Sequence, residues 1–546
     1  MGLSLHGYLE TRPSSNVPVL STREALHRHV IQPIESIELG VRQALAAFLA
    51  VVFARYFLEA LLEGQGVLAL HLDLRYGLTD FLHVMVSWGV LFILTTLGIA
   101  LGTGRDLPRI NRMVLVCFPV IWLPPLWDFI FGSSAEIVYQ HDFSEFTSSF
   151  IGLFNPFVPV GYVTPGVRVE VACAVGFVFF YTVLSGRGLS SWLRGLFTGA
   201  WVYCMVFLLG FLPAIWSVVL DSDHQSLLGA SVLGVNNASA ALLWYFPLLL
   251  SAGPVWLRYS SPSSCQALRS SVRPSRLLIY LIISGLAFLS AGQIGLLEYD
   301  WLNVYDLSLI LLMNMALALA FIAMTMLNDL HDREIDQISN ADRPLVTGKV
   351  TAAEFCTLAW ICGVVSLALA VVVDEVAIYP LAITIAIGYL YSAPPFRLRR
   401  FVGVAHLCLA GIAGGVYLFG ASPVLGTMTF QQIDRGQLLS LMVLFFVGAH
   451  FKDIKDIAGD RRCGVVTLPT LLGAQRAYWL IGGLVVVGVA MLLLSSVLIN
   501  GPTAWLALGL FTCGWLLLRN AERLFWVILV SLGLLFVSHT GFLGIV

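Results

Sequence analysis

The sequence predicts an all-α integral membrane protein, and three observations support this fold class. Of the 546 residues, 58% are hydrophobic and only 11% are charged, whereas a soluble domain has about 25% charged residues. The mean hydropathy is +0.87. Apolar runs of roughly 20 residues, long enough to cross a bilayer, recur along the whole chain. A soluble protein of this composition would have no means of covering its surface, whereas lipid-facing helices can be apolar on every side.

The apolar runs predict about 15 transmembrane helices, six before residue 260 and nine after it. They lie near residues 40–60, 81–103, 112–131, 167–186, 193–219, 238–257, 277–297, 305–327, 353–373, 376–393, 402–421, 438–451, 476–499, 503–518 and 523–544.

The charges of the loops predict an orientation for these helices. Arginine and lysine gather in alternate loops, for example Arg333, Arg343 and Lys349, while the loops between them are acidic or neutral, as at Glu298 and Asp300. Basic loops face the cytoplasm under the positive-inside rule. We therefore expect a multi-pass protein of the cell or inner membrane, with a cytoplasmic N-terminus and an outer C-terminus.

One segment divides the chain into two predicted domains. Residues 258–276 form the only long linker-like stretch and are rich in Ser, Pro and Arg. The sequence thus predicts an N-terminal membrane module of about six helices over 1–260, a cytoplasmic linker over 261–276, and a nine-helix domain over 277–546. The N-terminal module has no motif that assigns a function, and it could act as a transporter, bind the acceptor, process the product on the outer face or dock a pathway partner.

Composition also excludes some classes of function. The net charge of −2 gives no polycationic surface for a nucleic acid partner. The nine cysteines are scattered and form no CxxC pair, so we expect neither disulfides nor a thiolate metal site.

The eighth predicted span ends in an acidic segment. Asp329, Asp332 and Asp336 are spaced i, i+3, i+7, which places them on one face of a continuous helix. Asn328 lies one turn before Asp332 and can join them. Three carboxylates on one face repel one another unless a cation lies between them, and Mg²⁺ prefers such hard oxygen ligands.

The twelfth predicted span ends in the same pattern, with Asp453, Asp456 and Asp460. A single cluster of this kind fits a solvated helix end equally well. Two clusters with matched spacing, both at cytoplasmic helix ends and four spans apart, instead indicate an internal duplication. Two such faces across a cavity could hold a diphosphate through bridging Mg²⁺.

These two segments resemble the UbiA superfamily of intramembrane prenyltransferases, whose signatures are NDxxDxxxD and DxxxD. Residues 328–336 meet the first signature and residues 456–460 the second, which Asp453 extends to DxxDxxxD. The nine spans after residue 277 equal the usual number of the family. The resemblance covers about half the chain and implies nothing about residues 1–260.

The resemblance implies an Mg²⁺-dependent enzyme that transfers a prenyl group from a polyprenyl diphosphate to a membrane-associated, lipophilic acceptor and releases diphosphate. It places catalysis at Asn328 and at Asp329, Asp332, Asp336, Asp456 and Asp460, and the aspartates together with Asp453 would bind the metal. Neutralising the charge of the diphosphate makes it a better leaving group.

Basic and aromatic residues near the motifs complete the predicted site. The family has basic residues in corresponding loops, so Arg343, Lys349 and Arg397 are the preferred diphosphate contacts, with Lys452 beside the second motif. Arg399 and Arg400 are further candidates, and all of them also fit the positive-inside rule. Tyr391 resembles a family tyrosine and could stabilise the allyl cation, although aromatic residues near an interface often act as anchors.

The sequence leaves the acceptor open. An aromatic quinone precursor, a tetrapyrrole, a lipid alcohol and a sugar phosphate all fit, and His450 could lie near the acceptor. A membrane terpene cyclase would use the same diphosphate site without an acceptor. A transporter is the alternative from another class, but it predicts charged or broken helices near the membrane centre, whereas both acidic clusters lie at helix ends.

Overall fold

The computed structural model describes most of the chain. The described residues are 22–62, 74–132, 146–153, 163–186, 188–220, 224–294, 302–333, 336–337, 340–401, 403–425, 433–451, 466–495 and 502–518, with isolated positions such as 453, 454, 457 and 461.

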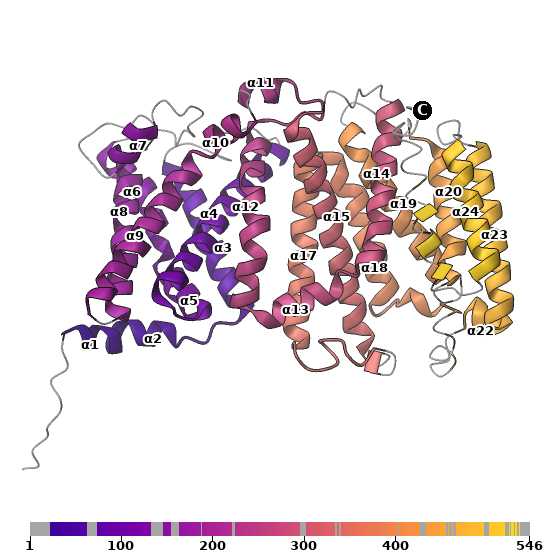
Figure 1. Cartoon of the computed structure of the whole chain (residues 1–546), viewed down its shortest axis with the longest axis horizontal. Coiled ribbons are helices and arrows are strands. Elements are labelled where there is room, and N and C mark those ends of the chain that lie inside the picture. Colours follow the sequence, from indigo (N-terminus) through magenta and orange to yellow (C-terminus); the bar gives the residue numbers. More distant parts are fainter. Residues whose placement is uncertain are drawn as a thin grey trace, which may run out of the picture.

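All described elements are helices, and they stand side by side in two neighbouring groups (Figure 1). The N-terminal group contains α1 (Thr22–Leu26), η1 (His27–Ile31), α2 (Gln32–Glu35), α3 (Val41–Leu62), α4 (Leu74–Thr103), α5 (Leu107–Cys117), η3 (Phe118–Trp122), α6 (Leu123–Phe131), α7 (Phe146–Gly152), α8 (Pro165–Ser185), α9 (Leu189–Gly210), α10 (Leu212–Val219), α11 (His224–Gly229) and α12 (Asn237–Ser260). The C-terminal group contains α13 (Pro262–Ser271), α14 (Pro274–Ile294), α15 (Val304–His331), α17 (Ala352–Val373), η5 (Glu375–Ala377), α18 (Ile378–Ser392), η6 (Leu398–Arg400), α19 (Val404–Leu425), α20 (Arg435–Gly448), α22 (Leu468–Leu472), α23 (Ala474–Ser495) and α24 (Pro502–Leu518).

The helical lengths confirm an all-α, multi-pass membrane protein. Among the described residues, 11 helices are long and apolar enough to cross a membrane, and they correspond to the first eleven predicted spans. Shorter apolar helices, Arg435–Gly448, Ala474–Ala490 and Trp505–Leu518, stand where the next three spans are predicted. The last predicted span falls largely outside the described residues, so the count of 15 and the orientation stay predictions.

The predicted linker contains a helix that packs against the C-terminal group. Within α13, Ser264 and Ala267 are completely buried. The hydroxyls of Ser263 and Ser264 donate to Oε1 of Glu354, at 3.0 and 2.7 Å, and Glu354 lies in the first turn of α17. This segment therefore holds α12 and α14 in a defined arrangement, while the domain division itself stays a prediction.

One hydrophobic core joins the two groups of helices. It contains Leu242 and Trp244 of α12 together with Leu309 and Leu312 of α15. The indole of Trp244 also donates to the hydroxyl of Tyr305, at 3.2 Å. Burial of apolar surface between α12 and α15 thus stabilises both groups.

Asp306 ties the start of α15 to the N-terminal group through a buried carboxylate. Its side chain is completely buried. It accepts hydrogen bonds from the Ser231 hydroxyl at 2.7 Å and from the backbone N–H groups of Leu233 at 3.0 Å and Val232 at 3.2 Å. It also accepts one from the backbone N–H of Asn303, at 3.1 Å. A buried charge is tolerated when its lone pairs are satisfied in this way.

The helices α14 and α19 approach so closely at Gly420 that no side chain fits between them. A Cβ at this position would lie 2.2 Å from the carbonyl oxygen of Ser284 and 2.6 Å from its Cα. Small residues allow such close approach between membrane helices. Gly420 therefore fixes how α14 and α19 pack.

We expect Gly420→Ala to destabilise the protein by about 1–3 kcal/mol, because the new methyl group meets backbone atoms that cannot rotate away. Gly363→Ala in α17 is the matched control, since its Cβ would make an ordinary contact of 3.8 Å with Ala323, and alanine favours helix. Thermal unfolding of the detergent-solubilised protein measures both. Equal melting temperatures for the two variants would contradict the assigned contact.

Candidate functional site

The first acidic motif lies at the end of α15, where the helix is interrupted at Asp332. The helix ends at His331, and Asp332 is its C-cap with φ −102° and ψ 9°. Asp336 follows one turn later, and its backbone N–H donates to the carbonyl of Asp332 at 2.8 Å. Asp329, Asp332 and Asp336 are 6%, 6% and 4% exposed. Ion pairs with arginines, rather than one helical face, gather these buried carboxylates.

Arg343 joins two of the three carboxylates. Its Nη1 donates to Oδ1 of Asp329, at 2.8 Å, and to Oδ2 of Asp336. The amide of Asn340 donates to the other oxygen of Asp336, at 3.1 Å. Burial raises the pKa of the Asp336 carboxyl above its ordinary value, and the charge of Arg343 acts in the opposite direction. The prediction that Arg343 lies at the acidic cluster is consistent with this placement.

Asp332 is held by residues from the end of α18 and the segment after it. Arg399 forms an ion pair with its Oδ2, and Arg397 lies 3.6 Å from its Oδ1. Asn328 donates to Oδ2 at 2.9 Å, and its own carbonyl oxygen accepts from the Ser392 hydroxyl at 3.2 Å.

One oxygen of this cluster has no hydrogen bond among the described residues. Oδ1 of Asp332 is buried and accepts none. Burying a charged oxygen without a donor is costly, so this atom is suited to bind a cation.

Arg273 belongs to the site, although no motif in the sequence indicates this role. Its Nη2 lies 2.5 Å from Oδ1 of Asp329. Arg273 lies in the Ser-, Pro- and Arg-rich segment 258–276, and no local spacing connects positions 56 residues apart. Arg273 and Arg397 both have φ of 43°, and they are the non-glycine residues with positive φ in the described part of the chain. Such backbone conformations occur where the surroundings hold a functional residue in place.

The structure describes only some of the other predicted site residues. Lys349 is exposed, and no polar contact of its side chain is seen among the described residues. Tyr391 is half-buried near the end of α18. Asp453 lies beside two histidines, His406 and His450. The predicted residues Lys452, Asp456 and Asp460 lie outside the described residues.

An apolar crevice of about 360 Å³ lies between α14 and α15. Its lining includes Leu281, Phe288, Met313 and Asn314. At 1.5 Å per residue, Asn314 lies about 22 Å along α15 from Asp329. A chain-like apolar molecule could extend over this distance toward the carboxylates.

The donor set of the cluster fits Mg²⁺. It consists of hard carboxylate oxygens, one of which is buried without a hydrogen bond. Four guanidinium groups surround the three carboxylates, those of Arg273, Arg343, Arg397 and Arg399. If all are ionised, the cations exceed the anions by one, which favours an anionic ligand that binds together with a metal.

Comparisons with known proteins identify the C-terminal half. Residues 277–540 match the model of the UbiA prenyltransferase family. The chain is 34% identical over 164 residues to homogentisate phytyltransferase of Synechocystis sp., which covers 28% of this chain and 51% of the relative. It is 28% identical over 191 residues to chlorophyll synthase of Oryza sativa subsp. japonica, which covers 34% of this chain and 50% of the relative. It is 30% identical over 199 residues to digeranylgeranylglyceryl phosphate synthase of Natronomonas pharaonis, and the match covers 35% of this chain and 63% of the relative.

Solved structures are also similar to about half of the chain. One is a UbiA homolog from Archaeoglobus fulgidus bound to GPP and Mg²⁺, with 19% identity, 50% of this chain and 99% of that chain covered, and a TM-score of 0.37. Another is a UbiA homolog from Aeropyrum pernix K1, with 20% identity, 49% and 98% coverage, and a TM-score of 0.39. The chain spans about half the length of the curated relatives with the first matches. By the family match, the C-terminal half of the chain belongs to the UbiA prenyltransferase family.

We expect Arg343→Gln to destabilise the metal-free protein by about 2 kcal/mol, because it leaves Asp329 and Asp336 with fewer positive partners. Mg²⁺ should raise the melting temperature of this variant more than that of the wild type, since the ion replaces the lost charge. Arg400→Gln, which changes an exposed arginine of the same region, is the control. An identical Mg²⁺ response in all three proteins would contradict the cation site.

Proposed function

We propose that the chain is an Mg²⁺-dependent prenyltransferase that moves a prenyl group from a polyprenyl diphosphate to a lipophilic, membrane-associated acceptor. The observation that carries the proposal is the buried carboxylate cluster at the end of α15, with an oxygen of Asp332 free of hydrogen bonds among the described residues and four arginines around it. The family match and the prenyltransferase names of the relatives support the same activity.

The metal would be held by Asp329, Asp332 and Asp336, with Asp456 and Asp460 as the second set of ligands. Bound Mg²⁺ would neutralise the diphosphate, so that it can leave with the electrons of the broken C–O bond. That Asp453 also binds Mg²⁺ stays a prediction.

The arginines would hold the diphosphate. Arg343 and Arg273 now pair with Asp329, and Arg397 and Arg399 pair with Asp332. When a metal takes these carboxylates, the guanidinium groups become available for phosphate oxygens, which they bind in a bidentate manner. Lys349 and Lys452 remain proposed as further contacts from the same side of the membrane, which the loop charges predict to be cytoplasmic.

The prenyl chain would occupy the crevice between α14 and α15. Its lining is predominantly apolar, and it lies along the helix that carries the first acidic motif. Apolar walls exclude water, which would otherwise capture the allyl cation. Tyr391 is proposed to face this cation or to position the substrate.

The acceptor is proposed only as a class. The names of the relatives include homogentisate, chlorophyll and digeranylgeranylglyceryl phosphate, so they do not agree on one acceptor. The N-terminal module could present the acceptor or dock a pathway partner, and we propose the boundary of the catalytic domain within residues 261–276.

The test is incubation of the purified full-length chain with Mg²⁺, a radiolabelled prenyl diphosphate and a membrane extract, followed by mass analysis of labelled lipids. A labelled product in which the prenyl group is joined to an acceptor molecule supports transfer. Diphosphate release with a cyclised hydrocarbon in the absence of extract supports a cyclase, and no consumption of the donor contradicts both.

We expect Asp332→Asn and Asp456→Asn each to lower prenyl transfer by about 10²-fold or more, because each removes a ligand charge at the leaving group. Asp342→Asn, an exposed aspartate in the segment that follows the first motif, should retain activity. Initial rates with the labelled donor and the thermal stability of each variant measure the effect. Full activity of Asp332→Asn would exclude the metal assignment.

A further inference from the structure

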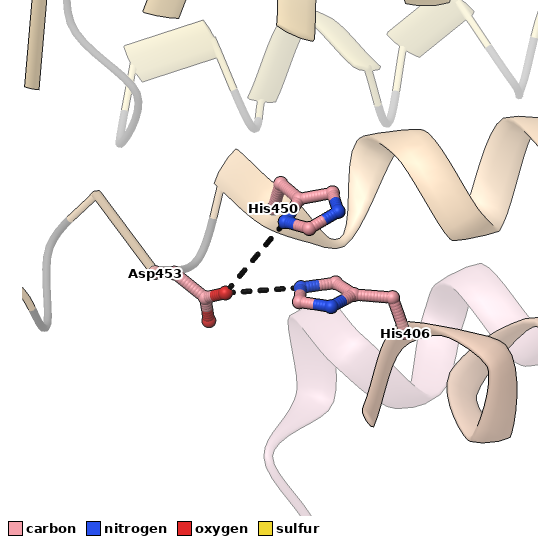
Figure 2. Close-up of side chains that lie close together, drawn as sticks. All are labelled: His406, His450 and Asp453. Carbon is pink, nitrogen blue, oxygen red and sulfur yellow. Dashed lines mark hydrogen bonds and ion pairs between the residues drawn. The ribbon is translucent and has the colours of Figure 1, made fainter. Parts of the chain in front are cut away.

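We propose that His406, His450 and Asp453 form a binding site for a divalent transition-metal ion such as Zn²⁺, in which Asp453 binds this ion instead of the Mg²⁺ assigned to Asp329, Asp332 and Asp336. Figure 2 shows the three side chains converging from α19 and from the segment that follows α20. The inference does not depend on prenyl transfer, since it concerns a second ion of different chemistry.

The geometry brings three ligand atoms close together. Nε2 of His406 lies 2.9 Å from Oδ2 of Asp453, and Nδ1 of His450 lies 3.9 Å from the same oxygen. The two imidazole rings are stacked, with centroids 3.4 Å apart and planes at 20°. One ligand atom from each residue lies within 4.8 Å of the others. A tetrahedral Zn²⁺ with bonds of about 2.0–2.1 Å holds its ligand atoms about 3.3 Å apart, so the set closes when the imidazole rings turn until both ring nitrogens face the ion.

Both histidine side chains are buried, and each has a ring nitrogen without a hydrogen-bond partner among the described residues. His406 is 3% exposed and His450 is 8% exposed. The Nδ1 atoms of both rings are buried and have no hydrogen-bond partner among the described residues. Buried polar atoms without partners destabilise a protein. Nδ1 of His450 is one of the three ligand atoms, so a bound metal ion would give this buried nitrogen a partner.

The ligand types select the ion. Two imidazoles and one carboxylate are the protein ligands of many three-ligand Zn²⁺ sites, in which a fourth position stays open to water or substrate. Mg²⁺ instead prefers an all-oxygen, octahedral set. Phe446 stands next to both rings, with centroids 6.3 Å from His406 and 6.0 Å from His450. This apolar wall limits the access of water, which strengthens metal coordination.

The ion would join two parts of the C-terminal half. His406 lies near the start of α19, whereas His450 and Asp453 lie at the start of the second acidic motif. A bound ion would therefore fix the first turn of that motif against α19. The open coordination position would bind an oxygen atom of a water molecule or of an acceptor beside the second acidic motif.

The experiment is a titration of the metal-free, full-length protein in detergent with Co²⁺, in the presence of millimolar Mg²⁺. Co²⁺ reports nitrogen ligation through its visible absorption bands, and we expect one ion per chain. His406→Ala and His450→Ala should each weaken Co²⁺ binding at least about tenfold. His29→Ala, an exposed histidine, and Asp332→Asn should leave it unchanged.

A second measurement keeps the test valid if a histidine variant does not fold. The X-ray absorption spectrum of the wild type with one equivalent of Zn²⁺ should show two imidazole ligands. A spectrum with oxygen ligands only, displacement of Co²⁺ by Mg²⁺, or unchanged binding in both histidine variants would overturn the site.

Discussion

The candidate site depends on the neutralisation of three buried aspartates by arginines from other segments. Asp329, Asp332 and Asp336 lie close together, and carboxylates in that position repel one another at low solvent exposure. Their partners come from the start of α14, from the segment after α15, and from the segment after α18. Because the arginines come from three different segments, the ion pairs also determine where these segments meet.

The membrane helices could be predicted from the sequence, while the end of α15 could not. The bilayer imposes a length of about 20 apolar residues on each span, and this constraint is local in sequence. Asp332, by contrast, leaves the helical conformation where arginines from a distant segment pair with it. The role of Arg273 could not be predicted for the same reason. This residue, which precedes α14, meets Asp329 of α15 only in the folded protein.

The spacing of the aspartates predicted the members of the first acidic cluster, but it did not predict the histidines that lie beside Asp453. The i, i+3, i+7 pattern identified Asp329, Asp332 and Asp336, and the structure brings these carboxylates together through Arg343 and its neighbours. The same pattern grouped Asp453 with Asp456 and Asp460, but the fold places Asp453 against His406. No sequence rule pairs a histidine in α19 with an aspartate 47 residues later.

The buried carboxylate of Asp306 has a consequence for how the two halves of the chain can change over evolutionary time. Its donors, Ser231, Val232 and Leu233, belong to the N-terminal half, whereas α15 carries the acidic motif at its other end. A chain without the N-terminal half would expose this carboxylate and the apolar surface beside it. Substitutions in one half therefore constrain those in the other. A substitution in the loop before α12 alters the surroundings of Asp306 and so of α15, although this loop lies at the opposite end of α15 from the acidic motif.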